Sequence, residues 1–220
     1  MTATDRAYEF TKGRVLDSTF AGGELITEGE VADALGMSRT PVREAFLRLA
    51  GEGLLRLYPK RGALVVPVSV AEVEAVMETR MLVERFALDK VLANGPATGI
   101  ADTLDAAIAE QEVRAAEGDA DGFVAVDREF HTTFVTAAGN PIITGLYDSL
   151  RDRQRRMVIT SLLIDTKRIE SILVEHRALS AAIRAGELER AQTVLEAHLR
   201  GTLDLLRPGG VERMSQAAAS

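Results

Sequence analysis

The chain has 220 residues and no cysteine, with 46% hydrophobic and 27% charged residues. This length suits one domain or two small ones, and the absence of cysteine excludes disulfides and thiolate metal sites. No apolar run approaches the roughly 20 residues that a membrane-spanning helix needs, and the first ten residues lack the pattern of a signal peptide. We therefore expect a globular, cytoplasmic protein without a membrane partner.

The net charge of −7 is unevenly distributed along the chain. Residues 36–63 contain six basic and two acidic residues, so this segment alone carries a charge of +4. An acidic surface is repelled by the phosphates of DNA, whereas a concentrated basic segment attracts them. The charge distribution therefore points to residues 36–63 as a candidate DNA-binding segment.

The first two predicted helices lie at the N-terminus. Residues 6–20 have loosely helical apolar spacing and are followed by two glycines. Thr27 and Glu30 have the three-residue spacing of a capping box, which predicts the start of a second helix. That helix is expected to end at Gly36, because glycine readily adopts the left-handed conformation found after helix ends.

A third helix and a β-hairpin are predicted next. Ser38 is expected to cap the third helix, whose apolar positions recur at helical spacing until Gly53. Residues 55–58 then alternate between apolar and polar or aromatic side chains, and residues 63–67 are apolar and largely β-branched. The Pro-Lys-Arg-Gly sequence at 59–62 is typical of the turn between two strands. Residues 1–68 are therefore predicted to form one small domain.

Three helices followed by a hairpin is the order of a winged helix-turn-helix domain, in which the second helix of the pair enters the major groove of DNA. Arginine can contact guanine through two hydrogen bonds, which suits Arg39 or Arg43. The candidate DNA-binding residues are Ser38, Arg39, Thr40 and Arg43 on the helix, and Lys60, Arg61 and Gly62 at the hairpin tip. The alternative is a solvated basic helix beside an ordinary hairpin. The agreement of the capping box, the glycine turn, the Ser-Arg-Thr-Pro start and the basic hairpin favours DNA binding.

The remainder of the chain is predicted to be entirely helical. Helical spacing with Gly, Asn or Pro between most segments predicts six helices joined by short loops, which is typical of an antiparallel bundle. Their ranges are 70–93, 99–117, 119–138, 141–163, 165–185 and 187–206. The fold class is thus mainly α, with a second domain over 69–207. Residues 208–220 are predicted to be disordered, because they are mostly small and polar.

All three histidines lie in this helical region. Asp127 and His131 are four residues apart and share one helix face. His176 and His198 are about 10 and 12 residues from the turn between the last two helices, so they lie at similar heights if these helices pair. Three nitrogens and one oxygen suit a divalent metal, with Zn first and Ni or Mn as alternatives. The competing interpretation is that these are ordinary hydrogen-bonded or surface histidines.

The run from Thr27 to Phe46 closely resembles the DNA-binding domain of GntR-family bacterial regulators, and the matching continues through Gly53-Leu54-Leu55 and Arg61-Gly62. The resemblance implies that Arg39, Thr40, Arg43 and Gly62 contact operator DNA. Many relatives have an arginine that helps bind DNA at the position of Gly29. Its absence here removes one expected contact.

Residues 70–206 resemble the FCD ligand-binding domain of the FadR subfamily of GntR regulators. The matching stretches are Glu78–Glu84, Asp127–His131, Ala138–Pro141, Glu175-His176 and Ala197-His198. The resemblance implies that Asp127 and the three histidines hold a divalent metal, to which a small carboxylate effector binds. Arg80 matches an arginine that pairs with the effector, although an ordinary salt bridge to Glu84 is the alternative. Six helices without a seventh favour the VanR-like branch over the branch that binds acyl chains.

The resemblance also implies a homodimer that binds a pseudo-palindromic operator, most often as a repressor relieved by its effector. A metal-dependent hydrolase is the rival interpretation, with Glu129 or Glu175 as the base. Glu129 is two residues from both Asp127 and His131, so it points away from their face, and a hydrolase would leave the basic N-terminal domain without a role. A metal-dependent structural dimer without an effector is also compatible with the sequence.

Overall fold

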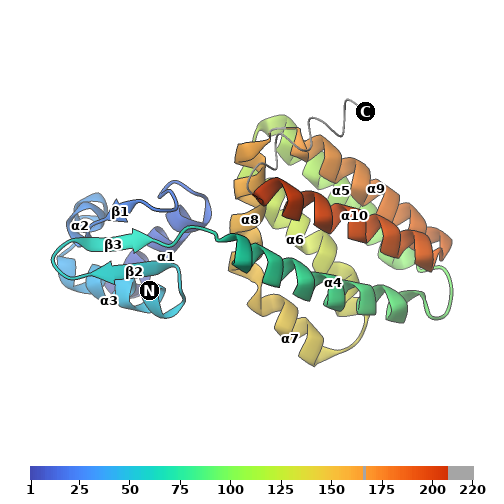
Figure 1. The fold of residues 1–220 in the computed structure, drawn as a ribbon, viewed down its shortest axis with the longest axis horizontal. Helices are drawn as coiled ribbons and strands as arrows, with labels where there is room; N and C mark the ends of the chain where they lie inside the picture. Colours follow the sequence, from blue (N-terminus) through green and yellow to red (C-terminus); the bar gives the residue numbers. More distant parts are fainter. Residues whose placement is uncertain (166, 208–220) are drawn as a thin grey trace. The chain divides into compact units, whose positions relative to one another are not determined.

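The computed structural model describes residues 1–165 and 167–207, and the predicted disorder of residues 208–220 lies outside these residues. The chain divides into two compact units, residues 1–69 and residues from Val70 onward (Figure 1). Within the described residues there are ten helices and one small three-stranded sheet, so the predicted mainly helical fold class is confirmed. We call the two parts the first unit and the second unit.

The first unit contains helices α1 (Ala3–Leu16), α2 (Glu28–Leu35) and α3 (Arg39–Gly51). α1 starts earlier than predicted, because Thr2 and Asp5 form a capping box at its start. It also ends earlier, at Leu16, where the prediction extended to residue 20. α1 and α2 both pack against α3. The interior of this unit is made of buried apolar side chains, which include Val15, Val31, Val42, Phe46 and Leu49.

The two turns that frame α2 follow from the sequence. The Thr27 hydroxyl accepts a hydrogen bond from the Glu30 N–H, and the Glu30 carboxylate accepts one from the Thr27 N–H, which completes the predicted capping box. Gly36 is left-handed with φ of 61°. Ser38 occupies the N-cap position of α3, as predicted, but its side chain makes no capping hydrogen bond.

The sheet contains β1 (Leu25–Ile26), β2 (Leu55–Tyr58) and β3 (Gly62–Val65), with β3 between the other two and antiparallel to both. β2 and β3 are the predicted hairpin, whereas β1 was not predicted. Gly62 has φ of +111°, and a Cβ atom at this position would lie 2.2 Å from the carbonyl oxygen of Ile26. The fold itself therefore requires glycine at the base of the hairpin tip.

The second unit contains seven helices within the described residues. They are α4 (Val70–Leu92), α5 (Thr98–Glu117), α6 (Ala120–Ala137), α7 (Pro141–Ser149), α8 (Arg151–Ile164), α9 (Arg168–Ala185) and α10 (Leu188–Leu206). The prediction of one helix over 141–163 is wrong, because the chain bends at Leu150. Next to the bend, the Ser149 hydroxyl donates to the Leu146 carbonyl at 2.6 Å, a local bond that competes with regular helix geometry. The argument from six helices to the VanR-like branch therefore loses its basis.

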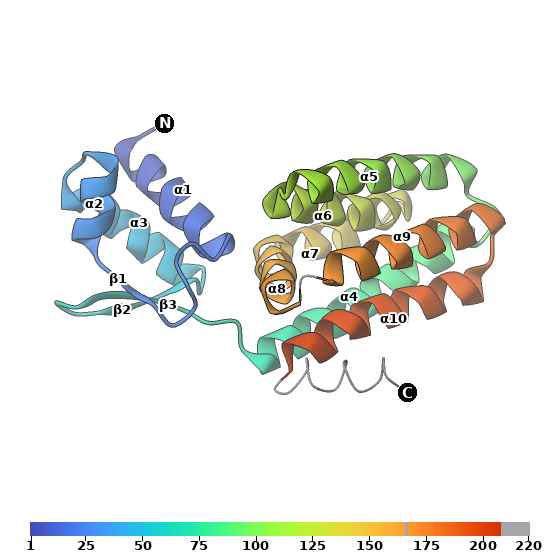
Figure 2. The same cartoon turned by 90° about the horizontal axis from the view of Figure 1, so that it is seen from above.

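The packing of the second unit brings five helices around a common interior. α5 lies against α6 and α9, while α10 lies against α4 and α9 (Figures 1 and 2). The link between α9 and α10 turns at Gly186, which is left-handed with φ of 74°. Among the described residues, no helix is long and apolar enough to cross a membrane.

Candidate metal centre and DNA-binding surface

Asp127, His131, His176 and His198 come together inside the second unit. Each offers one ligand atom, and these four atoms lie within 4.8 Å of one another. Asp127 and His131 project from α6, while His176 and His198 project from α9 and α10. All four side chains are buried. The register argument for the last two helices agrees with the structure, since the rings of His176 and His198 are 4.9 Å apart between centroids.

Each histidine has a hydrogen-bond acceptor beside its Nδ1 atom. His131 Nδ1 donates to Glu84 Oε2 at 2.8 Å, and His198 Nδ1 donates to Glu175 Oε2 at 2.7 Å. His176 Nδ1 donates to Gln111 Oε1 at 2.8 Å, and its ring stacks on Phe130 with centroids 3.9 Å apart. Because Nδ1 carries the proton in each ring, the lone pair of each neutral imidazole is on Nε2.

The Nε2 atoms face one another and match the donor set of a metal ion. His131 Nε2 and His198 Nε2 are 3.1 Å apart, and two nitrogens bound to one ion at about 2.1 Å lie roughly this far apart. His176 Nε2 and Asp127 Oδ1 are 3.6 Å apart. Both of these atoms are buried, and neither has a hydrogen-bond partner among the described residues. Two lone pairs in contact repel, so a cation between them would relieve the repulsion.

The electrostatic environment disfavours protonation of His176 and His198, so a proton is a poor candidate for the cation between these atoms. Burial lowers the pKa of His176 well below its ordinary value, and the nearby charges of His198 and His131 lower it further. Burial also lowers the pKa of His198, and this effect outweighs the hydrogen bond to Glu175 that opposes it. These two imidazoles are therefore neutral near pH 7, which is the form that binds metals.

Arg80 lies beside this centre and forms the salt bridge to Glu84 that the sequence analysis gave as the alternative to effector binding. Arg80 Nε donates to Glu84 Oε1 at 2.7 Å, and both residues are buried. The Tyr147 hydroxyl, brought in by α7, donates to the same oxygen at 3.0 Å. Burial alone would raise the pKa of Glu84, but the charge of Arg80 and the hydrogen bonds from His131 and Arg80 hold it well below its ordinary value. Glu84 is therefore an anion that holds both Arg80 and His131.

The two glutamates considered as catalytic bases are not placed for that role. Glu129 is exposed, consistent with the expectation that it points away from Asp127 and His131. The two carboxylate oxygens of Glu175 accept hydrogen bonds from His198 and from Arg168, whose Nη1 atom is 3.0 Å away. Glu175 is thus engaged in orienting side chains.

Sequence reasoning missed most of the residues around the four ligands. Gln111 is a polar residue on the buried face of α5 that includes Leu104 and Ile108, a pattern that could have marked it. Glu84 is one turn from Arg80, and its spacing suggested only a salt bridge. No local pattern distinguishes Tyr147, because its contact with Glu84 depends on the bend between α7 and α8.

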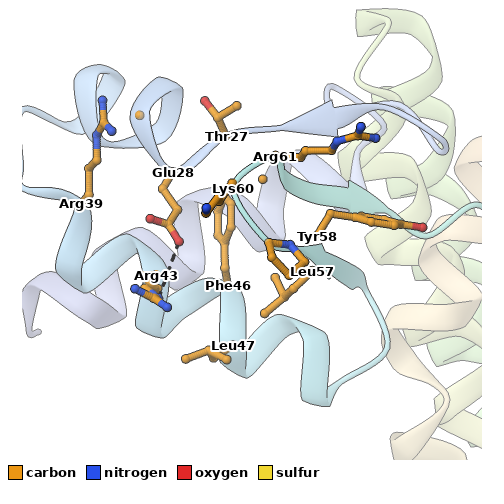
Figure 3. A pocket seen from close by; sticks show the side chains of 13 residues that line it. Thr27, Glu28, Arg39, Arg43, Phe46, Leu47, Leu57, Tyr58, Lys60 and Arg61 are labelled. Carbon is orange, nitrogen blue, oxygen red and sulfur yellow. Dashed lines mark ion pairs between the residues drawn. The ribbon is translucent and has the colours of Figure 1, made fainter.

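Five of the seven candidate DNA-binding residues of the first unit line one groove with a volume of about 830 Å³ (Figure 3). It runs between the start of α3 and the hairpin tip. Its lining includes four exposed basic residues, Arg39, Arg43, Lys60 and Arg61. Ser38 and Thr40 are exposed at the start of α3 but do not line the groove, whereas Gly62 does.

The basic side chains of the groove have few partners. Arg43 forms one long ion pair with Glu28, at 3.9 Å (Figure 3), while Arg39 makes no hydrogen bond or ion pair with a described residue. Lys60 has φ of 62°, a left-handed conformation that is unusual for a residue with a side chain. Arg48, another basic residue of α3, instead packs over the Tyr8 ring with its guanidinium 3.6 Å from the centroid.

Comparison with known proteins identifies the family. Residues 3–65 match the bacterial regulatory proteins of the gntR family, and residues 75–201 match the FCD domain. The chain belongs to the GntR family of transcription regulators. It combines the two domains typical of the FadR subfamily, as the resemblance implied, and this assignment identifies a regulator rather than an enzyme.

Individual relatives agree with this assignment. The chain is 28% identical over 193 residues to an uncharacterized HTH-type transcriptional regulator of Streptomyces ambofaciens, covering 86% of this chain and 79% of that protein. It is 24% identical over 207 residues to the HTH-type transcriptional repressor RspR of Escherichia coli, covering 91% and 87%. A GntR transcriptional regulator from Rhodococcus has the same fold, with a TM-score of 0.74, 24% identity and coverage of 94% and 98%.

Proposed function

We propose that this chain is a ligand-responsive repressor that binds a pseudo-palindromic operator as a homodimer. Residues 1–68 would bind DNA, and residues 69–207 would bind the effector and form the dimer. The observation that carries the DNA-binding part is the groove of the first unit, which has four exposed basic side chains. Among the described residues, the one ion pair that these side chains make is the long contact of Arg43 with Glu28. In a homodimer, two-fold symmetry would present two copies of α3 to two half-sites.

We assign base contacts to Arg39 and Arg43. Phosphate contacts are assigned to Ser38 and Thr40 at the start of α3, beside the groove, and to Lys60, Arg61 and Gly62 at the hairpin tip. Arg39 occupies the space next to Gly29, where a Cβ atom would lie 3.3 Å from its Nη2 atom. Gly29 stands where many relatives have an arginine. In this chain Arg39 is therefore the basic side chain that covers the start of α2.

The test of DNA binding begins with an operator selected from random-sequence DNA by the purified chain. We expect Arg39→Ala to weaken operator binding by about 1–3 kcal/mol, because a bidentate contact to guanine is lost. Binding to random duplex should change much less. Arg190→Ala, which removes an exposed arginine of the second unit, is the matched control. Equal losses on operator and random duplex would show that Arg39 does not read bases.

For the second unit, we propose that Asp127, His131, His176 and His198 bind a divalent metal, with Zn first and Ni or Mn as alternatives. The facing Nε2 atoms and the buried, unpartnered Asp127 Oδ1 support this proposal. When bound, the metal would supply a positive charge and an open coordination position for the effector's carboxylate. The Nη1 and Nη2 atoms of Arg80 donate to no described residue. We propose that they bind the same carboxylate while Nε stays on Glu84.

Metal analysis of the full-length protein tests this site. We expect about one divalent ion per chain in the wild type and almost none in His198→Ala, because losing one of four ligands removes much of the binding free energy. Glu129→Ala alters an exposed residue next to the ligands on α6 and should keep the ion. A metal-free wild type whose melting temperature does not change on addition of Zn, Ni or Mn would refute the site.

Regulation requires that the effector bind more tightly to one arrangement of the dimer than to the other, because only this difference can change the affinity for DNA. Small carboxylates and sugar acids are the class to screen by thermal shift, with metal present. A true effector should raise the melting temperature of the wild type. The same compound should not raise the melting temperature of Arg80→Met. In the wild type it should also change the affinity for the operator.

A further inference from the structure

Two buried chains of Arg, Glu and His converge on the candidate metal centre. In the first, Arg80 holds Glu84, and Glu84 accepts the Nδ1 proton of His131. In the second, Arg168 holds Glu175, and Glu175 accepts the Nδ1 proton of His198. The Nε2 atoms at the ends of the two chains are 3.1 Å apart. The two chains differ in how fully the arginine is engaged.

Arg168 is engaged at both ends of its guanidinium and is only 1% exposed. Its Nη1 atom donates to Glu175 Oε1 at 3.0 Å. Its Nη2 atom donates to the His198 carbonyl at 3.0 Å and to the Thr202 hydroxyl at 3.1 Å. Arg168 therefore contacts the backbone of His198 directly and its imidazole ring through Glu175.

α10 has a gap in its side chains that admits this guanidinium. A Cβ atom at Gly201 would lie 3.2 Å from Arg168 Nη1 and 3.3 Å from Nη2. Glycine in the middle of a helix costs stability relative to alanine, but here it leaves room for a planar, charged group against the helix. The missing side chain at Gly201 thus lets the Arg168 guanidinium lie against α10, although its Nε atom is buried without a hydrogen-bond partner among the described residues.

We propose that Arg168 is a positioning residue for the metal centre: it fixes the Glu175 carboxylate, which in turn fixes the orientation and the Nδ1–H form of His198. This inference rests on the proposed metal site. A neutral imidazole can carry its proton on either nitrogen, and a proton on Nε2 would block that atom as a ligand. The Glu175 side chain is 24% exposed, so without Arg168 it is free to turn toward water and leave His198 without its acceptor.

The position of Arg168 lets one side chain join two helices at the metal ligand. Arg168 is the first residue of α9, two turns before Glu175, while His198 and Thr202 belong to α10. Its guanidinium therefore connects the start of α9 to both the backbone and, through Glu175, the imidazole ring of His198.

The experiment uses the full-length protein and zinc in competition with a chelator. We expect Arg168→Met to weaken zinc binding about 10–100-fold, the usual loss when a group that orients a metal ligand is removed. Arg168→Lys keeps the positive charge and is the variant to measure if Arg168→Met does not fold. It should also weaken binding, because an ammonium lacks the planar fork that joins the three acceptors. Arg184→Met removes an exposed arginine of the same helix and should leave zinc affinity unchanged.

A second readout separates positioning from a purely structural role. In the metal-free protein, nitrogen NMR of the histidine rings should show His198 with its proton on Nδ1 in the wild type and a population with the proton on Nε2 in the Arg168 variants. Folded variants with wild-type zinc affinity and an unchanged His198 ring would overturn the proposal, even if their melting temperature falls. A wild type that binds no zinc would overturn the proposed metal site instead. The protonation of the His198 ring would then still show whether Arg168 fixes its Nδ1–H form.

Discussion

The basic side chains around the two candidate sites are placed in opposite ways. In the first unit, Arg39, Arg43, Lys60 and Arg61 are exposed around a groove, and Arg43 has only a long ion pair with Glu28. In the second unit, Arg80 and Arg168 are 2% and 1% exposed and are hydrogen-bonded to carboxylates.

This difference follows from the cost of removing charge from water. A buried charge must be paired, whereas an exposed one remains hydrated and available to a phosphate. Exposed arginines in this protein should therefore affect binding with little effect on folding, and buried arginines should affect both. The predictions below test this distinction.

The largest effect is expected from Glu84→Leu. This change leaves Arg80 buried without its counter-ion, and breaking such a pair by removing one partner costs about 3–5 kcal/mol of stability. Urea denaturation measures the loss. Replacing both residues, as in Arg80→Met with Glu84→Leu, should cost less than Glu84→Leu alone, because no unpaired charge is then buried.

An exposed ion pair is the control for this prediction. Asp102→Ala breaks the pair between Asp102 and Arg184, whose side chains are 70% and 41% exposed, and should change stability too little to measure. If Glu84→Leu costs no more than Asp102→Ala, burial does not determine how strongly an arginine ion pair contributes to stability.

A smaller loss is expected from Gly62→Ala at the base of the hairpin tip. An added Cβ atom would meet the Ile26 carbonyl at 2.2 Å, and Gly62 has φ of +111°. Backbone strain of this kind costs about 1–3 kcal/mol. Hydrogen exchange of the first-unit amides measures the loss without requiring the two units to unfold together.

Gly13→Ala is the matched control in the same unit, because a Cβ atom at Gly13 meets nothing within 4 Å. It should stabilise α1 by about 0.5–1 kcal/mol. A Gly62→Ala protein with normal amide protection and reduced operator affinity would mean that Gly62 is needed for DNA contact and not for the fold.

Most of the helix boundaries could be predicted because local residues set them. Thr27 and Glu30 cap α2, and Gly36, Gly118 and Gly186 are all left-handed at helix ends. Helical periodicity also predicted the pairing of Asp127 with His131 and, across the last two helices, of His176 with His198. The meeting of the two pairs in one site was expected from the resemblance to the FCD domain.

Features that depend on distant partners were not predictable. β1 is only two residues long and exists through its pairing with β3. The bend at Leu150 contains neither glycine nor proline, the usual signals of a break. Glu84 reaches His131 because α4 packs against α6, and Gln111 reaches His176 because α5 packs against α9. Single-chain periodicity does not indicate which helices will be neighbours.

The smallest effects compare two hydroxyl side chains that the sequence treats alike. Both Thr27 and Ser38 precede a helix, but only Thr27 makes a capping hydrogen bond. Thr27→Ala should therefore destabilise the first unit by about 1 kcal/mol, measured by hydrogen exchange. Ser38→Ala should leave stability nearly unchanged and instead weaken DNA binding, because the Ser38 hydroxyl is free of an intramolecular cap and exposed at the start of α3. Equal losses of stability in the two variants would mean that Ser38 supports the fold after all, and would remove it from the proposed phosphate contacts.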